Sequence, residues 1–480
     1  MLHLKQAIVD RIGAIVGEEN VSTRVADLYT YGFDASIHHR SPDLVVRPTS
    51  TEEVSELMKI CYQEEIPVLA RGAGSGLCGS AVPLEGGVIL DMARMNQIKD
   101  IRVEDLNCDV EAGVIYDRLN KALAPHHFFF PPTPGSGEIC TIGGMVAANA
   151  SGMRAIKYGA TRDYVLGLTV VLSNGDIIEV GTNTMKNSSG YQLERLMVGS
   201  EGTLGVITEV TLKIAPKPMT AAMAVAAFDD VRKAGECVSA IIAKPMIPSA
   251  IELMDKICIT AVNKTMDVGF PDCEALCLIE VDGEPIMVER EVKKVEEICR
   301  EVGAKTVDFS SDPEQMAAWT AGRKAVLPAL SRLGEGWVSV SLADDMGVPI
   351  SKIPDAVVAF QEIARRNEVL VGTYGHAADG NLHTKMLLDP EDPQSWENGE
   401  RAVGEIFDKC IELGGTVTGE HGVGISKAPW MKRERDSALW AMMAIKRALD
   451  PKNILNPGKL MDWEGSILTK LRYPCKEYAD

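Results

Sequence analysis

Hydrophobic and polar positions follow two different patterns along the chain. From about residue 40 to residue 218, short apolar runs of strand length alternate with glycine-rich turns and a few helices. Further on, the chain consists of longer helical segments separated by strands, for example at 287–303 and 351–368. This change of pattern predicts an α+β protein with two differently built parts.

The boundary between the two parts falls at the proline-containing segment 215–219. A chain of 480 residues is also too long for one ordinary core. We therefore expect a first domain at 1–218, with a helical lead-in at 1–40, and a second domain at 219–480. Within the second domain, 448–480 is expected to return to the first one.

Individual elements are clearest around the first glycine-rich segment. In 49–65 the apolar residues fall on one helical face, and Ser50 with Glu53 forms the pattern of a capping box. Two strand-like runs at 66–70 and 88–92 then flank the glycine-rich segment. We expect a helix, a strand, a loop and a second strand in that order.

Composition and charge exclude several classes of protein. The net charge of −19 argues against nucleic-acid binding, because no basic patch is available to displace counterions from phosphates. No apolar window is long enough for a membrane span, and the N-terminal segment, with Asp10 and Arg11 inside its apolar run, predicts an amphipathic helix rather than a signal peptide. We expect a cytoplasmic protein.

The cysteines indicate a reducing environment. The chain has 11 of them, an odd number, and none forms a C-x-x-C pair. A disulfide framework and an iron–sulfur cluster held by this chain alone are both disfavoured.

Residues 74–79 match the pattern G-x-G-x-x-G. A nicotinamide-binding Rossmann unit needs a helix directly after these glycines, and here Pro83 and the pair Gly86-Gly87 prevent one. The segment either forms a nest of backbone N–H groups for an anion or is a plain tight connection. Further glycine-rich loops at 141–152 and 199–205 favour a long ligand that lies against much backbone.

Two of the eight histidines, His376 and His383, flank an Asp-Gly turn signal. If Asp379 and Gly380 form a two-residue hairpin turn, His376 faces His383 on one face of the ribbon. That pair is either a structural contact or a clamp for one metal ion. The dipeptide Glu420-His421, among the glycines of 414–424, could complete a set of two histidines and one carboxylate, which suits zinc, manganese or ferrous iron; alternatively it is a solvated turn.

The segments VVRPTSTEEV, RGAGSGLCGS, TIGGMVAANASG, YGATRDYVLGL and VGSEGTLGVIT resemble the FAD-binding domain of vanillyl-alcohol oxidase (PCMH-type) flavoproteins. The resemblance implies an α+β fold with this FAD-binding domain followed by a ferredoxin-like α+β substrate (cap) domain. It also implies non-covalent FAD, because the first loop carries Ser75 where some relatives attach the flavin through a histidine. The residues expected to bind FAD are Arg71, Gly72, Ala73, Gly74, Ser75, Gly76, Gly79, Ser80, Pro134, Thr141, Gly143, Gly144, Asn149, Ser151, Glu201, Gly202, Ile207 and Asn456.

Three further segments, GHAADGNLH, EHGVG and ILNPGK, resemble the FAD-linked D-2-hydroxyacid dehydrogenases. This family includes D-lactate dehydrogenases and the catalytic subunit of glycolate oxidase. The resemblance implies a divalent metal held by His376, His383 and Glu420, with His421 as the catalytic base. Arg323, in a W-x-x-x-R segment, is expected to bind the substrate carboxylate, and the alternative for it is a plain surface arginine. Lys385 is also taken as a candidate catalytic residue, at a position where some relatives carry an asparagine that contacts the substrate.

The expected reaction is oxidation of a D-2-hydroxy acid to the 2-oxo acid, with hydride transfer to flavin N5. D-lactate is the first candidate substrate, and glycolate and 2-hydroxyglutarate are others. The electrons would pass to a separate acceptor, such as an electron-transfer flavoprotein or an iron–sulfur subunit, and a homodimer is left open. The alternatives are a metal-free flavin oxidase of another alcohol, a nicotinamide-dependent dehydrogenase and a non-catalytic subunit.

Overall fold

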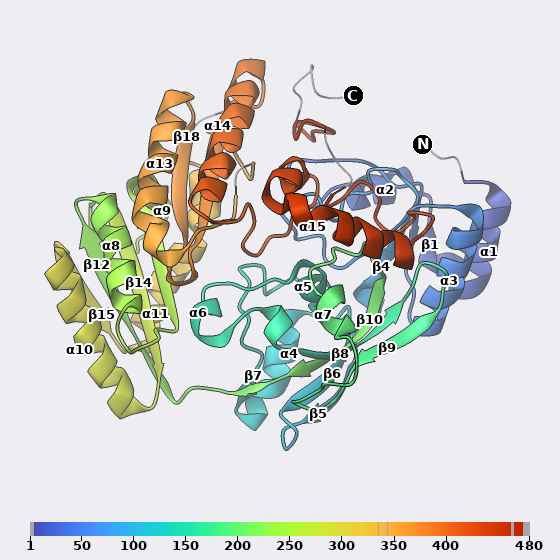
Figure 1. Ribbon diagram of the computed structural model, residues 1–480, viewed down its shortest axis with the longest axis horizontal. Helices are drawn as coiled ribbons and strands as arrows, with labels where there is room; N and C mark the ends of the chain where they lie inside the picture. Colours follow the sequence, from blue (N-terminus) through green and yellow to red (C-terminus); the bar gives the residue numbers. More distant parts are fainter. Residues whose placement is uncertain (1–3, 335, 343, 462–464, 474–480) are drawn as a thin grey trace.

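Three large β-sheets with covering helices make up the protein (Figure 1). The computed structural model describes residues 4–334, 336–342, 344–461 and 465–473. The first two sheets belong to the N-terminal part and the third to the C-terminal part, which lie side by side in Figure 1.

The first sheet has the strand order β1-β2-β4-β3, and β2, β4 and β3 run parallel. No helix occurs between β3 and β4, in agreement with the prediction that the glycines do not open a Rossmann helix. Ser50 caps α3 as predicted, by accepting a hydrogen bond from the backbone N–H of Glu53. The elements of this region are α1 (Gln6–Val16), η1 (Glu18–Asn20), β1 (Val21–Ser22), α2 (Val25–Tyr31), β2 (Leu44–Val46), α3 (Thr51–Glu64), β3 (Val68–Arg71), β4 (Val88–Asp91) and η2 (Met92–Arg94).

The second sheet is antiparallel, with the order β5-β6-β10-β8-β9. Helix α5 packs its apolar side chains into the core of this sheet, and its glycines remain on the cavity side. The elements are β5 (Ile98–Arg102), β6 (Asn107–Glu111), α4 (Tyr116–Leu123), η3 (Ala124–His126), β7 (Phe128–Phe129), α5 (Ile142–Ala148), α6 (Ala155–Tyr158), η4 (Thr161–Asp163), β8 (Val165–Val171), β9 (Ile177–Gly181), α7 (Leu193–Met197), β10 (Val206–Lys213) and β11 (Ala215–Pro216).

The third sheet begins as a ferredoxin-like unit. Two β-α-β segments give the antiparallel order β15-β12-β14-β13, and β18, β19 and β16 extend the sheet beyond β13. The elements are β12 (Thr220–Phe228), α8 (Val231–Ile242), β13 (Ala250–Asp255), α9 (Lys256–Thr265), β14 (Ala275–Gly283), α10 (Pro285–Val302), β15 (Thr306–Ser310), α11 (Pro313–Lys324), α12 (Val326–Leu330), β16 (Val338–Val340), β17 (Met346–Gly347), η5 (Ile350–Lys352), α13 (Ile353–Arg366), β18 (Leu370–His376), η6 (Ala377–Asp379), β19 (Asn381–Leu388) and α14 (Pro393–Glu412).

The two faces of the third sheet have separate cores, because successive side chains of a strand point to opposite faces. One face packs against α8, α10, α13 and α14, and the other packs against α9 and α12. Glu252, Tyr374, His376, His383 and Lys385 alternate with residues of the first core, so they lie on the second face.

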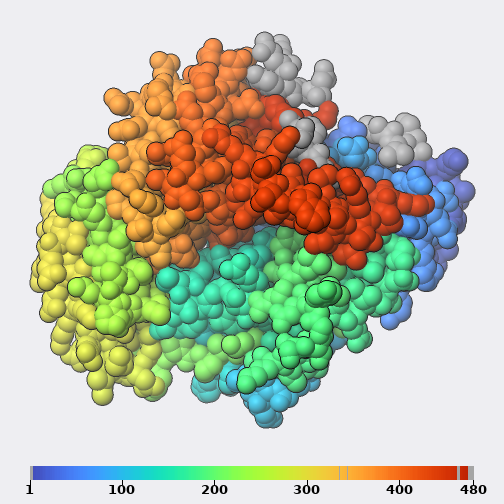
Figure 2. Space-filling model, in the orientation of Figure 1, coloured from blue at the N-terminus to red at the C-terminus, as the bar shows by residue number. Residues whose placement is uncertain are grey.

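After the third sheet, the chain returns to the N-terminal part. Helix α15 (Ala428–Leu449) crosses the front of the molecule between the two parts, where Figure 2 shows its residues in red. Leu455 then forms a bridge with Val68, and Leu471 forms one with His38. Among the described cysteines, all of which are buried, none forms a disulfide.

Candidate active site

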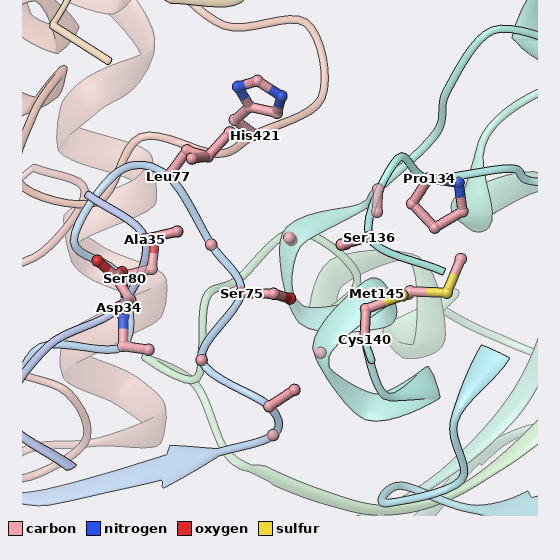
Figure 3. Close-up of a pocket in the computed structure, with 18 of the residues that line it drawn as sticks. Asp34, Ala35, Ser75, Leu77, Ser80, Pro134, Ser136, Cys140, Met145 and His421 are labelled. Atoms are coloured by element: carbon pink, nitrogen blue, oxygen red, sulfur yellow. Dashed lines mark hydrogen bonds between the residues drawn. The ribbon is translucent and has the colours of Figure 1, made fainter. Parts of the chain in front are cut away.

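A cavity of about 880 Å³ lies between the two parts of the molecule. Its walls come from the glycine-rich loops of the N-terminal part and from β18, β19, α11 and the loop before α15 of the C-terminal part. Figure 3 shows the loop around Ser75 running through this region, with Ser80 and Asp34 on one side, Cys140 and Met145 on the other, and His421 beside Leu77.

The loop after β3 packs so tightly that a side chain does not fit at two of its glycines. A Cβ atom on Gly72 would lie 2.2 Å from Thr141 Oγ1, and one on Gly74, whose φ is +66°, would lie 2.1 Å from Arg71 Nη2. The Arg71 guanidinium does not need a ligand to be satisfied, because it donates to the carbonyl oxygens of Phe33 at 2.8 Å and Ala81 at 3.1 Å. Arg71 therefore supports the shape of this loop.

Most of the residues predicted to bind FAD line the cavity. They are Arg71, Gly72, Ala73, Gly74, Ser75, Gly76, Ser80, Pro134, Thr141, Gly143, Gly144, Glu201, Gly202 and Ile207. Such a wall, made of backbone and small side chains, fits a long dinucleotide.

Four predicted FAD residues lie outside the cavity lining. Gly79 leaves room for His38 and Ile425, and Asn149 ends α5 with a φ of +52°. Ser151 Oγ donates to Glu420 Oε2 at 2.9 Å, and Asn456 Nδ2 donates to the carbonyl oxygens of Ser80 and Glu201. A contact of any of these four residues with FAD stays a prediction.

The predicted register of the histidine hairpin is wrong. His376 pairs with Asn381, and His383 pairs with Tyr374. The reason is that 377–379 form a turn of 3-10 helix and Gly380 adopts a φ of +84°, which makes the loop longer than two residues. The two histidines are therefore diagonal neighbours on the same face, and their ring centroids are 5.1 Å apart.

Three imidazoles converge on one carboxylate oxygen. The Nε2 atom of His376 lies 3.2 Å from Glu420 Oε1, and the Nε2 atoms of His383 and His421 each lie 3.6 Å from it. One ligand atom each from Asp345, His383, Glu420 and His421 lie within 4.8 Å of one another. The donor set of imidazoles and carboxylates fits a divalent transition metal. The structure thus brings His421, predicted as the base, into the same cluster as the three predicted ligands.

The opposite nitrogen of each imidazole faces a second carboxylate. His376 Nδ1 lies 2.6 Å from Glu252 Oε1, whereas His383 Nδ1 and His421 Nδ1 lie 3.4 Å and 3.3 Å from the two oxygens of Asp344. Carboxylates in this position orient metal-ligating histidines and increase their basicity. Glu252 and Asp344 are therefore part of the site, although neither was predicted.

Charges inside the cluster shift its pKa values in opposite directions. Burial by itself lowers the pKa of His376, but Glu252 and Glu420 outweigh it and raise that pKa well above its usual value. Burial dominates at His383 and lowers its pKa. Burial opposes ionisation of Glu420, yet the three histidines hold its pKa below the usual range. The cluster thus favours the anionic form of Glu420 and the cationic form of His376.

The backbone of the Glu420-His421 loop is organised by Asp345. Its carboxylate accepts hydrogen bonds from the backbone N–H groups of Gly419, Glu420 and His421, and Lys427 Nζ donates to it at 2.9 Å. Asp345 is fully buried and has a φ of +81°, a strained conformation for a residue other than glycine. This carboxylate was missed too, although an acidic pair inside a mostly apolar run, 338–348, is a signal that could have revealed it.

Arg323 and Lys385 both line the cavity, but their surroundings differ. Arg323 is buried over the ring of Tyr374, its Nε lies 2.5 Å from Glu252 Oε2, and its Nη2 has no hydrogen-bond partner among the described residues. Lys385 is fully buried and its Nζ donates to Ser341 and Asp344. A free donor is therefore available at Arg323, whereas the Lys385 ammonium is already paired.

Protein-family models match the chain in two regions. The model of an FAD binding domain covers residues 42–181, and the model of the C-terminal domain of FAD linked oxidases covers 217–460. The glycolate oxidase subunit GlcD of Bacillus subtilis is 41% identical over 456 residues, which cover 94% of this chain and 96% of that protein. The chain belongs to the FAD-linked oxidases. This FAD-linked oxidase is therefore an enzyme, a flavoprotein oxidoreductase, as predicted from its motifs.

Other relatives and solved structures agree with this assignment. A D-lactate dehydrogenase of Anaerostipes hadrus is 33% identical, with 93% of this chain and 94% of that protein covered. The 4-ethylphenol oxidase from Gulosibacter chungangensis is 17% identical with a TM-score of 0.78, and p-cresol methylhydroxylase is 19% identical with a TM-score of 0.76. These two structures cover 95% of this FAD-linked oxidase, and they extend over 97% and 96% of their own chains. At such identities they show the fold alone, and the predicted fold is confirmed.

In the part of the chain that the structure describes, no helix combines the length and the apolar character needed to cross a bilayer.

Proposed function

We propose that this FAD-linked oxidase oxidises a D-2-hydroxy acid to the 2-oxo acid, with a divalent metal at the histidine cluster. The convergence of three Nε2 atoms on Glu420 Oε1, at one side of the flavin cavity, is the observation that carries the proposal. When bound, FAD would accept the hydride at N5 and the metal would polarise the substrate hydroxyl group.

Arg323 supplies the recognition of an acid. A planar guanidinium binds a carboxylate with two parallel hydrogen bonds, and Nη2 of Arg323 has no partner among the described residues. Glu252, held between Arg323 and His376, fixes the distance between the carboxylate site and the metal ligands. This spacing favours a substrate whose hydroxyl and carboxylate groups are close together, as in a 2-hydroxy acid.

His421 takes the hydroxyl proton. Its Nδ1 faces Asp344, which leaves Nε2 directed toward Glu420 and the cavity. Burial by itself lowers the pKa of His421, but Asp345 and Asp344 outweigh it and raise that pKa, so the imidazole is a stronger base than usual. His376, His383 and Glu420 hold the metal in this proposal, and Lys385 acts on the site by neutralising Asp344.

The names of the relatives support a choice of substrates to test and of an electron acceptor. GlcD is named as a subunit of glycolate oxidase, and the relative of Anaerostipes hadrus is named a D-lactate dehydrogenase. Lactate and glycolate are therefore the first substrates to test, with 2-hydroxyglutarate as a longer one. The subunit name supports transfer of the electrons to a separate protein, such as an electron-transfer flavoprotein or an iron–sulfur subunit.

The test is stopped-flow bleaching of the bound flavin with D- and L-2-hydroxy acids, with and without a chelator. We expect bleaching with a D-enantiomer, loss of the reaction in chelator and recovery with a divalent metal. His421→Asn should keep the yellow flavin and the metal but reduce the bleaching rate by a factor of roughly 10² to 10⁴. A rate unaffected by prolonged chelation, with no metal in the protein, would favour a metal-free alcohol oxidase and overturn the proposal.

A further inference from the structure

The last described residues of the chain form a segment that is anchored to both parts of the molecule. We call residues 465–473 the C-terminal strap. Ile467, Leu468 and Leu471 are buried in the same core as Ile37 and the third sheet. The strap is therefore a packed element of the fold and not a loose end.

Main-chain hydrogen bonds fix the strap beside residues 37–39. The backbone N–H of His39 donates to the carbonyl oxygen of Lys470 at 2.6 Å, and the N–H of Arg472 donates to that of Ile37 at 2.9 Å. His38, fully buried, adds a contact of 2.8 Å between its Nδ1 and the carbonyl oxygen of Thr469. These bonds fix the backbone at Arg472 and at the residues that precede it.

Arg472 lines the flavin cavity, and its guanidinium has weak partners. Nη1 lies 3.4 Å from the carbonyl oxygen of Asp34, and Nη2 lies 3.3 Å from the hydroxyl oxygen of Tyr473. Both acceptors are neutral and both distances are long for hydrogen bonds. The side chain is exposed, so its charge is available to a ligand in the cavity.

The other arginine and lysine residues of the cavity wall either have partners already or lie in the C-terminal part of the molecule. Arg71 donates to backbone carbonyl groups, Arg323 pairs with Glu252, and Lys385 pairs with Asp344. Lys324 is on α11, in the C-terminal part of the molecule. Arg472 is thus the lining cation that lies against the N-terminal part without a charged partner among the described residues.

Arg472 is also next to the glycine-rich loop. Its acceptor Asp34 receives the backbone N–H of Ala81 at 3.4 Å, and the N–H of Ala35 donates to the carbonyl oxygen of Gly76 at 2.9 Å. Figure 3 shows Asp34 and Ala35 beside Ser80, across from Ser75. A phosphate held by the N–H groups of this loop would lie on the side of the cavity from which Arg472 projects.

We propose that Arg472 binds the pyrophosphate of FAD and that the C-terminal strap is a second clamp on the cofactor, beside the glycine-rich loop. The glycine-rich loop supplies backbone dipoles but no free cation, since the Arg71 guanidinium already donates to backbone carbonyl groups. The two negative charges of the pyrophosphate require a nearby cation. The proposal rests on FAD binding alone and is independent of the substrate and of the metal.

The test is release of FAD from the holoenzyme on dilution, followed by the rise of flavin fluorescence. Arg472→Ala should raise the Kd for FAD roughly 10- to 100-fold, the range for loss of a hydrogen bond to a charged group. Arg472→Lys should recover part of this affinity, because the charge remains but the fork is lost. Lys470→Ala is the matched control: it removes one charge from the same strap at a position outside the cavity lining, and we expect less than about a twofold change.

Three readouts keep the outcome decisive. A Kd for FAD in Arg472→Ala that equals the wild-type value overturns the proposal, and so does an equal effect of Lys470→Ala. If Arg472→Ala lowers Tm without FAD, Arg472→Lys decides: a Kd no better than that of the alanine variant overturns the role of the charge. An unchanged Kd with a raised KM for the hydroxy acid would place Arg472 at the substrate carboxylate instead.

Discussion

The two walls of the flavin cavity differ in composition: one is mainly backbone and the other is mainly charged side chains. The N-terminal wall is backbone: Gly72 and Gly74 lie where a Cβ atom would collide with a neighbour, and both line the cavity. The C-terminal wall is side chains: three imidazoles, four carboxylates and their cationic partners lie in contact, buried or nearly so. In the proposed function, the first wall binds the phosphate-bearing cofactor, and the second would supply acid–base and metal chemistry.

The comparison shows two different ways in which a site can be sensitive to mutation. The backbone wall loses its shape when an atom is added to one of its glycines, because its loop is already in contact with Thr141 and Arg71. The side-chain wall is destabilised when a charge is removed, because each buried carboxylate is balanced by a histidine, an arginine or a lysine. Ser151 links the two, since it belongs to the glycine-rich segment after α5 and donates to Glu420.

The largest expected effect follows from adding one methyl group to the backbone wall. Gly74→Ala forces an L-residue to a φ of +66° and places Cβ against the Arg71 guanidinium, so the Kd for FAD should rise about 100-fold or more, while the metal content stays unchanged. Flavin absorbance and metal analysis of the purified protein measure both. Gly190→Ala, at a φ of +86° with nothing within 4 Å, carries the same backbone strain away from the cavity and should keep its FAD. Equal loss of FAD in both variants would contradict the argument from the wall.

A smaller effect should follow from removing one charge from the side-chain wall. Asp344→Asn keeps the shape but weakens the orientation of His383 and His421, so metal affinity should fall roughly 10- to 100-fold with FAD retained. Metal retained after dialysis against graded chelator concentrations measures it. Asp379→Asn, in the hairpin that carries His383 but without a hydrogen bond to a ring nitrogen of His383 or His421, serves as the control. Metal retention equal to that of the wild type in Asp344→Asn would show that this carboxylate does not support the ligands.

The smallest effect concerns a cation behind the backbone wall. Burial lowers the pKa of Lys459 to about 7 from a usual 10.5, and its Nζ donates to the carbonyl oxygen of Val82 at 2.7 Å. Between these two pH values the unfolded chain holds a proton that the folded protein has released, so the contribution of Lys459 to the free energy of unfolding rises with pH. The difference between wild type and Lys459→Met should therefore grow in favour of the wild type by about 1–2 kcal/mol from pH 6 to pH 8. Urea unfolding at both pH values measures it, and a difference independent of pH would mean that the buried amine stays protonated.

Local patterns in the sequence were sufficient for the elements and for the backbone wall. The apolar stripe of α3, the flanking strands and the glycine-rich loop between them depend on residues a few positions apart, and the structure contains all of them. The family resemblance rested on the same short segments, and the family models and relatives bear it out.

Tertiary structure decided the side-chain wall. Glu252, Asp344 and His421 come from segments far apart in the chain, and no local period shows that they will meet. The hairpin register was wrong for the same reason, because the turn at 377–380 adapts to the packing around it while a strand pattern specifies only which face a residue takes. Arg472 is the extreme case: its place in the cavity depends on buried apolar neighbours and on main-chain bonds to residues more than 400 positions earlier. Sequence alone therefore indicated histidines, an acid and an arginine of suitable chemistry, and only long-range packing determined which residues stand together around them.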